Sequence, residues 1–138
     1  MTESISGIRA ALAAALDGVG GLKAYAEWPL SMQVPCVVVQ TGRILYGETM
    51  GGGYTPRFDL FLLANPQQSA PQQQDSLDAA LMPTGSSSLA GAIDSDPTLG
   101  GLDLTARVVG ARDYGKVINI RGSNSEYASV TIEVEVLA

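Results

Sequence analysis

Two pairs of carboxylates are the strongest candidates for chemistry in this 138-residue chain. Asp75 and Asp78 stand three residues apart, which places them on one face of a predicted helix, and Glu133 and Glu135 share one face of a predicted strand. Either pair offers the oxygen ligands that hard cations prefer, or the carboxyl groups used in acid/base catalysis. A metal site needs further converging oxygens, and a catalytic carboxylate needs burial to tune its pKa. The sequence indicates neither, so we expect both pairs to be solvated surface charges.

Other reactive groups are sparse. The chain has no histidine and one cysteine, Cys36, which excludes Cys/His zinc sites, histidine-dependent nucleophiles and an intramolecular disulfide. Cys36 lies in an apolar run and is expected to be a core residue. The serines at 86–88 lack the G-x-S-x-G context and suit helix caps, and the glycines at 51–53 lack the Lys-Ser/Thr that completes a P-loop. We expect no enzymatic activity, no cofactor and no metal.

The charge balance also limits the partners. The formal net charge is −6, and the eight Lys and Arg residues are scattered rather than gathered into the basic stripe that nucleic-acid binding requires. No apolar run approaches the roughly 18 residues of a membrane span. The N-terminal stretch has acidic Glu3 before its apolar residues and predicts a helix rather than a secretory signal. We therefore expect a protein made in a cytoplasm, with no membrane and no specific DNA contact.

Helix signals occur at the N-terminus and in the middle of the chain. Ser4 can cap a helix over residues 5–16, whose apolar residues recur at three- and four-residue steps. Pro71 suits the first turn of a helix that ends before Pro83. The serines at 86–88 can then cap a second short helix, so the middle of the chain predicts a two-helix insertion.

Strand signals fill the rest. The last segment is the clearest, because apolar and polar residues alternate strictly through 126–137. Short links between most strands predict an α+β fold, in which a mostly antiparallel sheet packs against the N-terminal helix and the two-helix insertion. No internal repeat or long linker divides the chain, so residues 1–138 are expected to form one domain. The predicted strands cover 22–28, 36–46, 57–63, 102–110, 116–121 and 126–137.

A series of landmarks follows in a specific order along nearly the whole chain. They are the Ala-rich helix 5–16, Gly21-Leu22-Lys23-Ala24-Tyr25, Trp28-Pro29, Pro35-Cys36-Val37-Val38-Val39, the strand 58–63, Asp75-Ser76-Leu77-Asp78-Ala79-Ala80-Leu81, the helix 88–93, Asp96-Pro97-Thr98-Leu99-Gly100-Gly101 and Val108-Val109-Gly110-Ala111-Arg112-Asp113-Tyr114-Gly115. In this order the chain resembles the tail terminator proteins of long-tailed, siphovirus-type bacteriophages, especially those that infect actinobacteria.

The resemblance implies a structural role in the virion. Such proteins form a homo-hexameric ring on the last ring of tail tube protein, stop tube growth and present a surface to the head-side connector or stopper. Genome DNA would pass through the lumen without specific binding, which an acidic chain suits. The expected location is the tail–neck junction of the virion, after assembly in the host cytoplasm.

Candidate residues for these contacts fall into two groups. Candidates for the lumen are Glu133 and Glu135, with Glu48 as an alternative. The candidates for the subunit or neck interface are Glu48, Tyr54, Arg112, Tyr114 and Arg121.

Other neck proteins, such as a connector, a stopper or a tail-completion protein, remain alternatives for the function, as do a small-molecule-binding domain and a host-encoded protein of a prophage.

Overall fold

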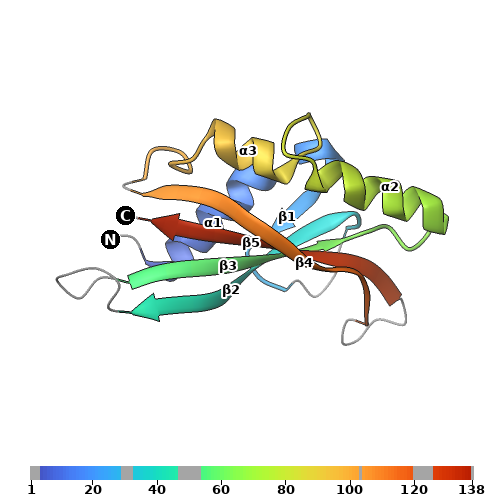
Figure 1. The fold of residues 1–138 in the computed structure, drawn as a ribbon, viewed down its shortest axis with the longest axis horizontal. Coiled ribbons are helices and arrows are strands. Elements are labelled where there is room, and N and C mark those ends of the chain that lie inside the picture. Colours follow the sequence, from blue (N-terminus) through green and yellow to red (C-terminus); the bar gives the residue numbers. More distant parts are fainter. Residues whose placement is uncertain (1–3, 29–32, 47–53, 103, 120–125, 138) are drawn as a thin grey trace.

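The computed structural model describes residues 4–28, 33–46, 54–102, 104–119 and 126–137, which form a five-stranded sheet with helices over one face (Figure 1). The order across the sheet is β1-β2-β3-β5-β4, in which β1 pairs with β2 in parallel and the other neighbours are antiparallel. The predicted α+β architecture is therefore confirmed. The strands are β1 (Lys23–Tyr25), β2 (Cys36–Tyr46), β3 (Tyr54–Leu63), β4 (Thr105–Asn119) and β5 (Glu126–Leu137), and the helices are α1 (Ile5–Leu16), α2 (Ala70–Leu81) and α3 (Leu89–Ser95).

Side-chain caps begin the three α-helices of the described residues. The Ser4 hydroxyl accepts a hydrogen bond from the Gly7 N–H at the start of α1, as predicted. Ser69 and Gln72 form a capping box at the start of α2. Ser88 caps α3 through the Gly91 N–H and donates its own hydroxyl hydrogen to the Met82 carbonyl, which ties α3 to the end of α2.

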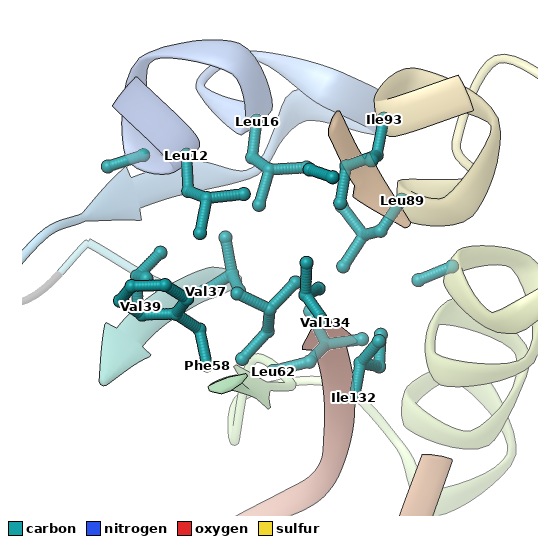
Figure 2. Packing of buried hydrophobic residues seen from close by; sticks show 14 of the residues in the cluster. Leu12, Leu16, Val37, Val39, Phe58, Leu62, Leu89, Ile93, Ile132 and Val134 are labelled. Carbon is teal, nitrogen blue, oxygen red and sulfur yellow. The ribbon is translucent and has the colours of Figure 1, made fainter. Parts of the chain in front are cut away.

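The main core lies between these helices and one face of the sheet, here called the inner face (Figure 2). Leu12 and Leu16 project from α1, and Leu89 and Ile93 project from α3, onto aliphatic residues of the central strands. All four are fully buried. Their sheet partners include Val37 and Val39 of β2, Phe58 and Leu62 of β3, and Ile132 and Val134 of β5.

The segment after the insertion differs from its prediction. The sequence predicts separate strands at 102–110 and 116–121, whereas the structure has one long strand, β4, paired with β5 along its length. Two shifts of register interrupt this pairing, and at the second one Asp113 and Gly115 have positive φ angles of 56° and 76°. Residues of that conformation are typical of turns, which is why the sequence suggested a break. An edge strand tolerates such bulges without losing its pairing.

The first strand is shorter than predicted. The sequence suggests a strand over residues 22–28, but pairing to β2 covers only Lys23–Tyr25. The chain then leaves the sheet and returns to begin β2 at Cys36. This connection is needed because parallel neighbours cannot be joined by a tight hairpin.

Candidate functional site

The face of the sheet that carries no helix, here called the outer face, is the most distinctive surface of the described residues. Residues alternate between the two faces along each strand. On β3, Phe58 and Leu60 point into the main core, so Arg57, Asp59 and Phe61 point to the outer face. The outer face is divided into an apolar half and a charged half.

The apolar half, here called the outer apolar cluster, lies where β1 and β2 begin. Cys36, Val38, Leu63 and Tyr127 form its buried members, and the half-buried Tyr25, Val34 and Phe61 pack against them. Trp28 lies beside Phe61 with the ring centroids 5.8 Å apart and remains 41% exposed. Gln33, shortly before β2, is tied to the cluster, since its N–H donates to the Tyr25 hydroxyl.

Cys36 is a structural thiol in this setting. It is fully buried, as the sequence predicts, and burial raises its pKa to about 11. A thiol with so high a pKa is almost entirely protonated at neutral pH and is a poor nucleophile. The outer apolar cluster therefore offers packing rather than reactivity.

The charged half contains a row of four side chains, one from each of four adjacent strands. Arg43 of β2 stands opposite Arg57 of β3, which stands opposite Glu135 of β5, which stands opposite Arg107 of β4. Arg107 Nη2 lies 2.8 Å and Arg57 Nη2 lies 3.4 Å from the two carboxylate oxygens of Glu135. We call these four residues the arginine row.

Glu135 is the centre of this row and is only 7% exposed. Hydrogen bonds from Arg107, followed by the positive charge of Arg57, hold the pKa of Glu135 below its ordinary value despite its burial. It is therefore ionised and paired on both sides at neutral pH. The expectation that Glu133 and Glu135 are both solvated charges is wrong for Glu135, because the register places it between two arginines.

The next rung of the sheet carries a second ionic cluster, centred on Arg112. Its Nε lies 2.7 Å from Glu133 Oε1, its Nη2 2.9 Å from Asp59 Oδ2, and its Nη1 3.1 Å from Asp113 Oδ2. The hydrogen bond to Glu133, and then the charge of Asp59, raise the pKa of the Arg112 guanidinium. Burial, with the negative charge of Glu133 beside it, raises the pKa of Asp59 above its ordinary value against the opposing charge and hydrogen bond of Arg112. Arg112 thus holds together acidic side chains from three strands.

Gly42 lies beside a hollow between the arginine row and the ionic cluster of Arg112. A hollow of about 200 Å³ lies above the sheet there, and a Cβ placed on Gly42 would come within 2.8 Å of the Asp59 carboxylate carbon. The carboxylates beside the hollow are engaged by arginines, so they are not free to act as general bases. The lining consists of Gly42, Arg43, Arg57, Asp59, Arg112 and Glu133.

The predicted site residues are only partly brought together. Arg112, Glu133 and Glu135 meet on the outer face. Tyr114 lies instead near α2, where its hydroxyl donates to Asp78 Oδ1 at 2.5 Å, and this bond is the main cause that raises its pKa. Tyr54 is the first residue of β3 and is half-buried. The remaining two candidates, Glu48 and Arg121, lie outside the described residues.

Sequence reasoning missed three arginines of the outer face: Arg43, Arg57 and Arg107. In sequence order Arg107 lies 28 residues and Arg57 lies 78 residues from Glu135, and Arg43 precedes them all. Only the cross-strand register shows that the three stand in one row with Glu135. The alternation of Arg57 and Asp59 on a polar strand face was the available signal.

Among the described residues no three His, Cys, Asp or Glu side chains form a group that could hold a metal ion. No helix in the same residues is long and apolar enough to cross a membrane.

Compared with known proteins, the chain matches no protein-family model and no curated protein sequence.

Proposed function

We propose that this chain is a structural virion protein of the tail-terminator kind. It would cap the tail tube as a homo-hexameric ring, end polymerisation of the tube protein and join the tail to a head-side connector or stopper. The observation that carries the proposal is the ordered set of landmarks, which fall on an N-terminal helix, a mostly antiparallel sheet and a two-helix insertion. This is the arrangement that the resemblance implies.

The chemistry of the outer face supports a role in contacts rather than in catalysis. Apart from Arg43, its charged groups are joined in ion pairs, and they do not surround an enclosed, largely apolar pocket of the kind that binds small substrates. A sheet face without a helix layer offers a broad surface on which a neighbouring protein can pack. Such a surface suits a protein whose work is assembly.

The lumen position of Glu133 and Glu135 stays a prediction, and the geometry changes what it would mean. Both carboxylates are paired with arginines, and four arginines and four carboxylates share the two ionic clusters. If this face lined the channel, its near neutrality would keep it from adhering to passing DNA. A strongly negative wall would have to come from other residues.

Electron microscopy of lysates tests the proposal in a phage that carries this gene with an early stop codon. Overlong or uneven headless tails beside DNA-filled heads are expected, because tube growth would have lost its stop. Tails of normal length that fail to join heads would move the protein to the connector or stopper class. Normal infectious particles would refute a role in virion assembly.

A further inference from the structure

The arginine row carries more positive charge than its own residues neutralise. Two of its arginines, Arg57 and Arg107, share the one carboxylate Glu135, and no ion pair joins Arg43 to another described residue. Arg43 and Arg57 stand directly opposite each other, an arrangement in which like charges destabilise a sheet. Arg57 Nε is buried and has no hydrogen-bond partner among the described residues. Taken alone, the row has two positive charges in excess, and the next rung, with Arg112 and three carboxylates, has the opposite excess, so the face is neutral as a whole. Arg43 is the exposed charge of the row that is left to bind an external anionic group.

The helical insertion has the opposite charge. Residues 64–104 contain five aspartates and no lysine or arginine. No acidic residue lies in the first turn of α2 or α3, where the helix dipole would stabilise it. Asp94 even lies in the last turn of α3, where a negative charge is disfavoured. The four aspartates that the structure describes there are all exposed: Asp75, Asp78, Asp94 and Asp96.

We propose that the arginine row of one copy of this chain binds the acidic insertion of a second copy. The inference rests on the proposed function in its claim that copies assemble with one another, and it names the two surfaces that meet. The insertion lies on the helix side of the sheet (Figure 1). The alternation of side chains along the strands places the arginine row on the side without helices. Each subunit can therefore bind one neighbour on each side, a head-to-tail contact that closes into a ring when the rotation allows.

This assignment places the outer face at a subunit boundary rather than in the channel. A second copy fits better than a nucleic acid, because Asp59, Asp113 and Glu133 lie on the rung next to the row and would repel phosphates. An aspartate of the insertion brings a single negative charge to the exposed Arg43, whereas a nucleic acid would lay a row of phosphates across the neighbouring carboxylates as well. Contact between exposed opposite charges also predicts an assembly that weakens as ionic strength rises.

The test uses two variants with reversed charge. Arg43→Glu with Arg107→Gln changes the excess of the row from two positive charges to one negative charge and leaves Arg57 on Glu135. Asp75→Lys with Asp94→Lys reverses the insertion, and the second change places a positive charge in the C-terminal turn of α3, where the helix dipole favours it. A control matched to the insertion variant, Asp17→Lys with Glu27→Lys, makes the same change in net charge as that variant at exposed acids outside the insertion. Circular dichroism checks that each variant is folded.

Light scattering after size-exclusion chromatography at low ionic strength gives the masses. The wild type and the control are expected to be oligomers, and each reversed variant alone a monomer. An equimolar mixture of the two reversed variants should recover the oligomer, because each reversed surface then finds its complement on the other variant. A monomeric wild type, reversed variants that still assemble, or a mixture that stays monomeric would each overturn the proposal.

Two additional results separate this proposal from its rivals. Fluorescence polarisation with duplex DNA measures whether the arginine row binds nucleic acid, and we expect the wild type and the row variant to behave alike. DNA binding by the wild type that the row variant loses, with an unchanged oligomer mass, would assign the row to nucleic acid and overturn the proposal. The stop-codon phage tests the terminator function separately. If its tails lose length control while the purified reversed variants still assemble, the terminator function is kept and these surfaces are rejected. Recovery of the oligomer on mixing, beside normal tails in the mutant, would keep the surfaces and reject the terminator.

Discussion

The two faces of the sheet are both largely covered, but different chemistry covers them. The inner face is buried by aliphatic side chains from α1 and α3, such as Leu12 and Ile93, and needs no directional partners. The charged half of the outer face is covered by long arginine side chains that lie across a buried carboxylate, Glu135. The inner face therefore depends on how well apolar side chains fill the space between helices and sheet. The outer face depends on register, since a slip of one residue would remove its cross-strand ion pairs.

The largest effect should come from truncating the inner face. Leu12→Ala removes a fully buried side chain of α1 and is expected to lower the free energy of unfolding by about 2–5 kcal/mol, because a cavity remains. The matched control is Leu137→Ala, at a leucine that is 37% exposed, and it should cost much less. Urea denaturation of both variants gives the comparison. Equal losses would contradict the location of the core.

The inner face was also the part that the sequence predicted well. Helical spacing identified the buried residues of α1, and strict alternation identified those of β5, because each pattern depends on a single segment. The outer face could not be predicted in this way. Whether Glu135 is solvated or buried depends on Arg57 and Arg107, which lie on other strands, and the sequence does not state the register between strands. Bulges such as the one at Asp113 make that register harder to infer.

A second prediction concerns crowding on the outer face. Gly42→Ala would place a methyl group against the Asp59 carboxylate that Arg112 holds, and should cost about 1–3 kcal/mol of stability. The control is Gly110→Ala, where a Cβ meets no atom within 4 Å and the change should be close to neutral.

A double-mutant cycle sharpens that result. Asp59→Ala removes the obstructing carboxylate, so Gly42→Ala should cost markedly less in the Asp59→Ala background than in the wild type. Strict additivity of the two changes would show that the methyl group and the carboxylate do not meet.

A third prediction removes the charge at the centre of the arginine row. Glu135→Gln keeps the shape of the side chain but loses the attraction of Arg57 and Arg107, and should cost about 1–2 kcal/mol, since both arginines still reach solvent. Glu133→Gln is the matched control on the same strand face, and its more exposed ion pair should matter less. Thermal or urea unfolding measures both. A larger loss for Glu133→Gln would reverse the assigned importance of the two carboxylates.

The smallest expected effect is the pH dependence of the stability difference between the wild type and Glu135→Gln. The pKa of Glu135 is lower in the folded chain than its ordinary value of 4.5, so the folded state binds this proton less readily than the unfolded state does. Its stabilisation is therefore complete above about pH 4.5 and is lost as the pH falls through the lower, folded-state value. The difference in unfolding free energy between the wild type and Glu135→Gln should stay constant at neutral pH and shrink in acid.

Asp59 acts in the opposite direction, because its raised pKa makes its burial less costly once it is protonated. Measuring Glu135→Gln in the Asp59→Asn background isolates the contribution of Glu135, and a gap that widened in acid would show that its charge is not stabilised in the folded state.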